Sequence, residues 1–380
     1  MIAPVVPMLE SFPPRSGFEI SLANPADDRE LRELLRNSPV SGQISVTFER
    51  EPSFYNSCHI RGDFFQVGIG RDRATGKIIG LGTRSVADGF VSGQSVPLGY
   101  LADLRLEHQY RGGTLIARGY RFLRQLHADC RTRLYTTVIF SENHVALTTI
   151  ASGRAGLPRY HDQGTIHCPG LNIRGARPPI HTGCEIVRGS ADLLPEVVEC
   201  LNRNNSRRQF APVQTLAMFR NRWRDFRIED FHVAVRGSKV VGVIGCWDQS
   251  AFKQTRIAGY NRRLGWMVPL ANIFRPVTRA PQYPKTGEEV SYFYLSFIAI
   301  DDDNLQVFRA LLRSAYNAAV GKGYLYAMLA LHGRDPLLPA LRDYSRTPFS
   351  GRLFCVTFED GEDLVRELDG RVPYVEASTF

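Results

Sequence analysis

The segment from Tyr100 to Tyr120, YLADLRLEHQYRGGTLIARGY, changes its residue pattern twice and so restricts the fold of the chain around it. Its first part alternates apolar and polar residues, which predicts a strand with Asp103, Arg105 and Glu107 on one face. A glycine pair follows, and after it the apolar residues take helical spacing. A strand that turns on glycines into a helix directs main-chain N–H groups at one point, which predicts an anion site.

The rest of the first half predicts an α/β (α+β) unit around this turn. Asn24 and Pro25 mark the start of a helix, because Asn caps helices and Pro fits their first turn. The order is strand, helix, long connection, three strands, helix, strand, helix and strand. The predicted elements cover residues 18–22, 24–37, 64–71, 77–90, 95–107, 114–127, 133–140, 143–152 and 157–168.

The second half repeats this order of elements with little residue identity. Strands are predicted near residues 184–189, 230–237, 239–247, 290–300, 324–332 and 351–358, and helices over 190–204, 303–323 and 335–344. A Pro-rich, irregular insertion precedes the strand at 290–300. We therefore expect two tandem units, each with a mixed, mostly antiparallel sheet flanked by helices. The expected division is a flexible tail (1–16), a first domain (17–170), a linker rich in Pro and Gly (171–184) and a second domain (185–380).

Composition limits the class of protein. With 380 residues, 43% of them hydrophobic, the chain can bury the cores of two domains. No apolar run approaches the length that spans a bilayer, and the N-terminal segment lacks the basic leader of a signal peptide. The seven cysteines form no C-x-x-C pair, which fits reduced thiols in the cytosol. We expect a cytoplasmic protein without a membrane partner, and the net charge of +9 favours anionic ligands.

The glycine turn fits neither common nucleotide motif. A P-loop requires Gly, four residues and then Gly-Lys-Ser/Thr, and a dinucleotide fingerprint requires three spaced glycines. The turn does resemble motif A of the GCN5-related N-acetyltransferases (GNAT superfamily), [ED]-D-L-x-V-x-x-x-Y-R-G-x-G-I-G, and Asn143 with Ala146 is similar to the family's N-x-x-A helix start. The matching residues are Asp103, Leu104, Leu106, Tyr110, Arg111, Gly112 and Leu115.

This resemblance implies an acyl-CoA-dependent N-acyltransferase, with acetyl-CoA as the expected co-substrate. The pyrophosphate would lie on the loop, and the pantetheine arm would lie where the strand before the loop separates from its neighbour. An amine of a small molecule or peptide would attack the thioester directly, and a backbone N–H near Leu104 would stabilise the oxyanion. The cofactor-binding residues implied are Leu104, Leu106, Arg111, Gly112, Gly113, Thr114, Leu115 and Asn143. We expect no metal.

Three residues depart from the family pattern. Thr114 stands where a second loop glycine is usual, although its hydroxyl can donate to a phosphate. Ala102 and Ile150 stand where some relatives carry the catalytic base and acid. From their expected proximity, Asp103 or Glu107 is a substitute base acting through water and Tyr160 is a substitute acid. The alternative for each is an ordinary structural residue.

The second half lacks the loop, because Asp301, Asp302 and Asp303 precede its long helix and would repel a pyrophosphate. In the family, an empty second half shapes the acceptor cleft or forms a dimer contact. Other functions consistent with the sequence are a catalytically silent binding protein and an aminoacyl-tRNA-dependent transferase. The segment FEREPSFY, residues 48–55, is read equally as part of the acceptor wall or as a helix entry.

Two further clusters carry weaker signals. Arginines are dense between Arg203 and Arg227 and alternate with aromatic residues, as in some RNA-binding proteins, but a solvated helix face over a core is commoner. His161, His167 and Cys168 are candidate metal ligands only if no bulge interrupts their strand, and zinc spacing is absent. We read these three as structural residues.

Overall fold

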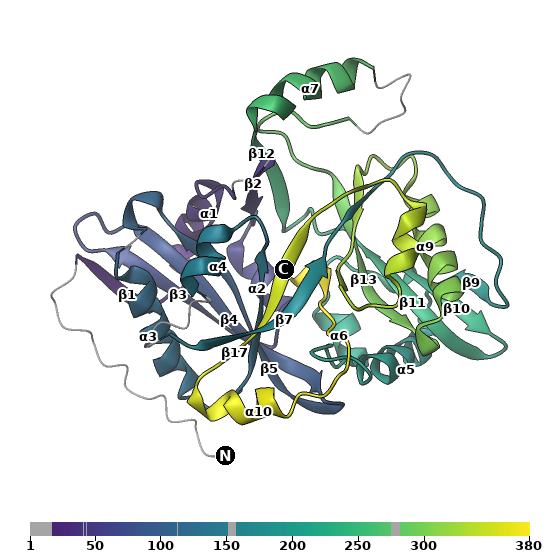
Figure 1. Ribbon diagram of the computed structural model, residues 1–380, viewed down its shortest axis with the longest axis horizontal. Helices are drawn as coiled ribbons and strands as arrows, with labels where there is room; N and C mark the ends of the chain where they lie inside the picture. Colours follow the sequence, from purple (N-terminus) through teal and green to yellow (C-terminus); the bar gives the residue numbers. More distant parts are fainter. Residues whose placement is uncertain (1–16, 41, 43, 112, 151–156, 275–281) are drawn as a thin grey trace.

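The computed structural model describes residues 17–40, 42, 44–111, 113–150, 157–274 and 282–380 (Figure 1). The predicted tail (1–16), Gly112 and the last two residues of the predicted helix 143–152 lie outside these residues. Two large sheets lie side by side with helices on their faces, and a narrow two-stranded ribbon projects between them (Figure 1). The α/β class and the two-unit architecture expected from the sequence are confirmed.

The first sheet has eight strands and contains the predicted glycine turn. All its neighbouring strands are antiparallel except β5 and β6, which run parallel. Their order is β1 (Phe18–Leu22), β3 (Phe64–Asp72), β4 (Ile78–Val91), β5 (Gln94–Leu106), β6 (Tyr135–Phe140), β17 (Ser350–Thr357), β7 (Arg159–His167) and β15 (Leu331–His332).

The two faces of the sheet at β3 and β4 carry different residue types, large apolar side chains on one and glycines on the other. One face carries Val67, Ile69 and Leu81 against helices α1 (Asp28–Arg36) and α2 (Phe54–His59). Side chains alternate across a strand, so the other face carries glycines. The register pairs Gly68 with Gly82 and Gly70 with Gly80, and helix α3 (Leu115–His127) covers this stripe.

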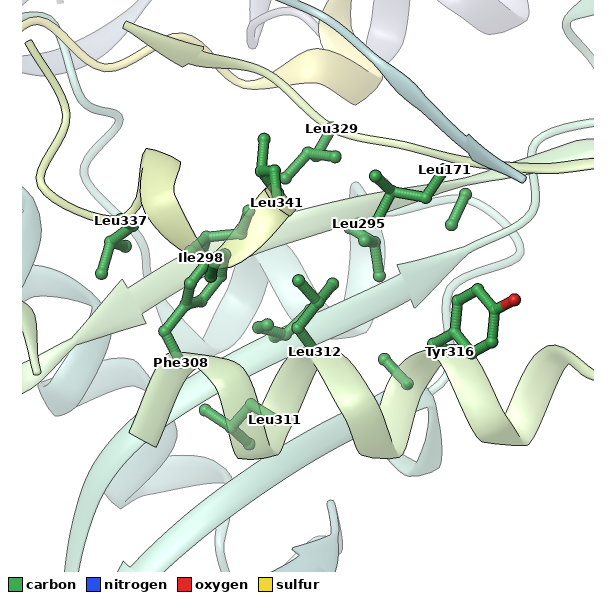
Figure 2. Close-up of a cluster of buried hydrophobic side chains, with 14 of the residues drawn as sticks. Leu171, Leu295, Ile298, Phe308, Leu311, Leu312, Tyr316, Leu329, Leu337 and Leu341 are labelled. Atoms are coloured by element: carbon green, nitrogen blue, oxygen red, sulfur yellow. The ribbon is translucent and has the colours of Figure 1, made fainter. Parts of the chain in front are cut away.

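The second sheet has seven strands with helices on both faces. Its order is β16 (Arg346–Thr347), β8 (Gly170–Asn172), β14 (Tyr326–Met328), β13 (Tyr292–Ile300), β11 (Lys239–Trp247), β10 (Phe231–Arg236) and β9 (Glu185–Arg188). Helix α9 (Leu305–Ala319) packs on one face, where its Phe308 and Leu312 meet strand residues such as Leu295 (Figure 2). Helices α5 (Leu194–Asn205) and α6 (Leu216–Asn221) cover the other face.

Strands do not keep to the division expected from the sequence. Strand β17 lies between β6 and β7 in the first sheet, and β8, at the junction of the expected first domain and linker, joins the second sheet. The ribbon pairs β2 (Ile44–Glu49) with β12 (Gln254–Tyr260) and carries helix α7 (Arg262–Ile273). The remaining α-helices of the described residues are two short ones, α4 (His144–Ile150) and α10 (Glu362–Arg366). The two units are thus interlocked.

Candidate active site

Strand β5 contains a bulge immediately before the glycine turn. Leu81 pairs with Arg105 but Thr83 pairs with Ala102, so Asp103 and Leu104 together face Gly82. Asp103 has φ +52, a left-handed conformation that is rare outside glycine. The strict alternation predicted from Asp103 to Glu107 is therefore wrong at the bulge, because one extra residue turns the following side chains to the opposite face.

The sheet opens between β5 and β6 beside this bulge. The parallel ladder joins only Gly99 with Tyr135 and Tyr100 with Thr136. Gly99 is required there, because a Cβ at that position would overlap the Tyr135 ring. Beyond this point the Thr137 hydroxyl donates to the Leu101 carbonyl at 2.8 Å, and the two strands separate. The separation expected from the resemblance is present in the structure.

A cavity of ≈ 600 Å³ opens at this gap and extends in two directions. One arm runs between the glycine stripe of β3 and β4 and helix α3, where Ile116, Gly119 and Phe122 line it. The other arm reaches the ribbon and the second sheet, where Val46, Ile257 and other residues of both strands form a wall. Most of the lining near α3 is apolar, so this arm suits a hydrocarbon group.

The glycine turn lies beside the cavity at the start of α3. Helix α3 has no acidic residue in its first turn and Thr114 makes no side-chain cap, so its first N–H groups are available to an anion. Gly113 has room, since a Cβ there would lie 3.6 Å from the Tyr110 carbonyl oxygen. Tyr110 donates to Asp72 at 2.6 Å and fixes the turn to the end of β3. The described residues at the start of α3 thus leave its first amides open beside the cavity.

The other expected cofactor-binding residues lie around the same opening. Leu104, Leu106 and Leu115 line the cavity. Asn143 also lines it, and its side-chain oxygen accepts the Ala146 N–H at 3.1 Å to cap α4. Arg111 borders the loop, with its Nε 3.4 Å from the Leu106 carbonyl oxygen. Gly112 lies outside the described residues.

Asp103 lies in a buried ion cluster. Arg61 donates to both of its carboxylate oxygens, and the Arg50 guanidinium lies 3.6 Å away. Burial alone would raise the pKa of Asp103, but the charges of Arg61 and Arg50 hold it well below its usual range. Asp103 is therefore an anion at neutral pH with low proton affinity. The Nε of Arg50, which also lines the cavity, has no hydrogen-bond partner among the described residues.

Tyr160 and Glu107 are placed differently from each other. Tyr160 lines the cavity, and its hydroxyl lies 2.6 Å from the Tyr120 hydroxyl. Burial, together with Tyr120, raises the pKa of Tyr160 well above its usual value, so it stays protonated. Glu107 follows the end of β5, accepts a hydrogen bond from Gln109 at 3.1 Å and is not among the residues that line the cavity.

The second unit contributes polar residues that the sequence did not indicate. Lys253, the residue immediately before β12, is buried and lines the cavity with Tyr292 and Tyr294. Its amine donates to the main-chain oxygens of Ser378 at 2.8 Å and Phe380 at 2.9 Å. Burial and the nearby charges of Arg50 and Arg61 lower the pKa of Lys253 well below its usual value. No sequence signal marks this residue, because the ribbon forms only through long-range pairing.

Strand β13 of the second unit has a bulge equivalent to that of β5, but the main-chain N–H at this bulge already has a hydrogen-bond partner. Phe297 in β13 has φ +54, and its main-chain N–H donates to the Glu376 carboxylate at 2.8 Å. At the start of α9, Asp301 is bound by Arg203 at 3.0 Å and Asp303 by Arg208. The acidic turn expected to repel a pyrophosphate is therefore held in place by arginines.

In the two weaker sequence clusters, the aromatic rings are buried and a bulge separates the histidines. Phe210, Phe219, Trp223 and Phe226, the aromatics between the arginines, are buried, so their rings are not available to stack on bases. Strand β7 has an irregular register beside Asp162 and Gly164, between His161 and His167, so the uninterrupted strand that a metal site would require is absent there. Among the described residues no group of three or more His, Cys, Asp or Glu side chains could hold a metal.

Comparisons with known proteins agree on the fold. The sequence matches no known family profile and no curated protein. A Saccharomyces cerevisiae N-myristoyltransferase with bound myristoyl-CoA aligns with a TM-score of 0.63 and 13% identity, over 96% of this chain and 87% of that chain. A GCN5-related N-acetyltransferase from Sphaerobacter thermophilus aligns with a TM-score of 0.52 and 11% identity, over 96% and 98%.

A third similar structure is a GCN5-related glucosamine N-acetyltransferase region of a fungal multi-domain β-N-acetylglucosaminidase. It aligns with a TM-score of 0.62 and 11% identity, over 92% of this chain and 38% of that chain. The overall fold of this protein is thus the fold shared by these structures. It includes that of the GCN5-related N-acetyltransferases, the fold that the resemblance of the glycine turn predicted.

Proposed function

We propose that this protein is an acyl-CoA-dependent N-acyltransferase whose first unit holds the donor. The observation that carries the proposal is the conjunction of a bulged strand, a parted sheet and an open helix N-terminus at one mouth of an apolar cavity. A pyrophosphate carries the negative charge that such a helix end attracts. Arg111 and Arg105 add positive charge there, and no carboxylate of the described residues lies within ion-pair distance of either.

In this proposal the pyrophosphate binds at residues 111–115 and the pantetheine arm enters the gap between β5 and β6. The thioester carbonyl then lies beside the bulge, where the Leu104 main-chain N–H would stabilise the oxyanion. Asp103 positions this N–H rather than moving a proton, because its two arginine partners hold it as an anion. Acetyl-CoA is the donor that the resemblance implies, and this arrangement would have room for its short acyl group. The apolar arm beneath α3 favours a longer acyl chain.

The acceptor amine would approach from the side of the second unit, where Lys253 and Tyr294 line the cavity. A neutral lysine has two N–H groups and one lone pair. The main-chain oxygens of Ser378 and Phe380 take the two N–H groups, which leaves the lone pair to accept a proton. Lys253 is therefore the proposed general base. The amine nitrogen bonds to the thioester carbon and gives its proton to Lys253, and the C–S bond breaks. Tyr160 donates a hydrogen bond to the departing thiolate, and Lys253 returns its proton to solvent, from which the thiolate is protonated.

Placing a carboxylate in the glycine turn is expected to abolish donor binding. Gly113→Glu brings a negative charge to the phosphates and should weaken acyl-CoA binding by about a hundredfold or more, measured by calorimetric titration. Gly113→Ala is the matched control and should bind nearly as the parent does, because a Cβ has room there. Equal affinity of parent and Gly113→Glu, with both proteins folded, would place the donor elsewhere.

Filling the apolar arm is expected to change the preferred acyl length. A Cβ on Gly82 would meet only Leu104, at 3.8 Å, so Gly82→Ile should fold and occupy the space beneath α3. We expect kcat/KM for myristoyl-CoA to fall about tenfold or more while that for acetyl-CoA is retained. Gly259→Ile, on β12 with open space around it, is the control. An unchanged ratio of the two donors would reject this arm as the acyl site.

A further inference from the structure

Helix α7 presents its apolar side to solvent, the reverse of an ordinary surface helix. Trp266 is 78% exposed, Met267 60%, Leu270 56% and Ile273 68%. Positions 266, 270 and 273 follow the spacing of one helix face, and Met267 lies beside them. A contiguous stripe of this kind on a soluble protein indicates a contact surface.

The other side of α7 is fixed to its ribbon. Val268 is buried, and Asn261 caps the helix by accepting the Leu264 N–H at 2.9 Å. The Asn272 side chain exchanges two hydrogen bonds with the Tyr283 main chain, each of 2.9 Å. These contacts hold the helix with the stripe turned outward. In Figure 1, α7 stands clear of both sheets at the end of the ribbon, so a broad flat partner can reach it.

The charge of this region favours an anionic partner. Between Asp248 and Glu288 the sequence has no acidic residue, in a chain with 38 acidic residues among 380. Besides the buried Lys253, the same interval contains six basic residues: Arg256, Arg262, Arg263, Arg275, Arg279 and Lys285, of which Arg275 and Arg279 lie outside the described residues. Arg262 and Arg263 are exposed at the start of α7, next to Trp266. Exposed tryptophan and apolar residues beside arginines are the composition of helices that lie at a lipid headgroup layer.

We propose that α7 docks the protein onto an anionic membrane surface, with the Trp266 face inserted at the level of the headgroups. This departs from the expectation drawn from the sequence, which was a protein without a membrane partner. No helix of the described residues is long and apolar enough to cross a bilayer. The ribbon that carries α7 also forms a wall of the cavity through Val46 and Ile257. Docking there would bring the cavity to an acceptor or an acyl donor held at the membrane, an inference that rests on the proposed function.

Co-sedimentation of the full chain with lipid vesicles, without acyl-CoA, tests the proposal separately from catalysis. The protein should bind vesicles of phosphatidylcholine with phosphatidylglycerol more tightly than phosphatidylcholine alone, and added salt should weaken the binding. Trp266→Glu/Leu270→Glu should lower binding about a hundredfold. Leu216→Glu, which changes a partly exposed leucine on α6, should bind as the parent does. Because Trp223 and Trp247 are buried, a blue shift of fluorescence on binding would come from Trp266.

Two results would overturn the proposal. One is a failure of the parent protein to bind anionic vesicles, or equal binding by the parent and the double variant. The other is sedimentation equilibrium showing a dimer that the double substitution dissociates, since a second copy of the chain would then cover the stripe. Acyl-CoA binding by the double variant should equal that of the parent, so failure here is distinguishable from failure of the proposed function.

Discussion

Lys253→Met should lower kcat by about a hundredfold to ten thousandfold, the range for loss of a positioned proton acceptor. The side chain is buried among Arg50, Arg61 and Tyr294, and methionine fills similar space without an acceptor. Acyl-CoA affinity should be retained, because the donor loop lies on the other unit of the fold. Steady-state release of free coenzyme A in the presence of an amine measures the effect. Lys77→Met, an exposed lysine, is the control.

The pH profile separates proton transfer from a purely structural role of Lys253. A base must be deprotonated, so kcat of the parent should rise with pH through the pKa of Lys253, which lies well below the usual value for lysine. The variant should lack this rise. If Lys253 only holds Ser378 and Phe380 in place, the variant will be slower at every pH with the shape unchanged. That second outcome would remove the assignment of Lys253 as the base.

Asp103→Asn should destabilise the protein by about 3–5 kcal/mol, the cost of breaking a buried ion pair from one side. The substitution leaves Arg61 and Arg50 buried, with side chains only 2% and 4% exposed, and takes away their shared anion. Denaturant unfolding measures the loss. Asp162→Asn, at a pair with Arg352 in which both side chains are about two-fifths exposed, should cost less than about 1 kcal/mol.

The same carboxylate predicts how stability changes with pH. Because the folded state lowers the pKa of Asp103, its contribution is fully present above the unfolded value of about 3.9 and is lost as pH falls below it. The parent should therefore lose unfolding free energy below about pH 4 through this group, and Asp103→Asn should lack that component. A loss of the same size and steepness in both proteins would mean that Asp103 is not the strongly paired group described above.

The local pattern of the sequence predicted the part of the site that one segment builds. Alternation, two glycines and helical spacing between Tyr100 and Tyr120 correctly indicated strand, turn and helix, because these depend on neighbours in the chain. The bulge at Asp103 was not predicted, since it depends on the pairing of β5 with β4. The glycine stripe could have been found, because Gly68, Gly70, Gly80 and Gly82 recur at strand spacing on either side of a predicted hairpin.

Contacts between distant segments account for what the sequence did not show. The sequence pattern places residues 44–49 in a long connection, yet they pair with residues 254–260 to form the ribbon. Strand β17 was predicted as a strand, but nothing in its local sequence indicates that it enters the first sheet. Lys253 and Arg50 reach the cavity only through these long-range pairings. The roles of Lys253 and of the residues at 111–115 are proposals that the substitutions above test, and the role of Tyr160 is likewise a proposal.

The most direct test of the account is a crystal structure of the protein with a thioether analogue of myristoyl-CoA. We predict the diphosphate at residues 111–115, the pantetheine arm between β5 and β6, and the acyl chain between the glycine stripe and α3. A diphosphate bound at the start of α9, or an analogue bound outside the cavity, would contradict the account.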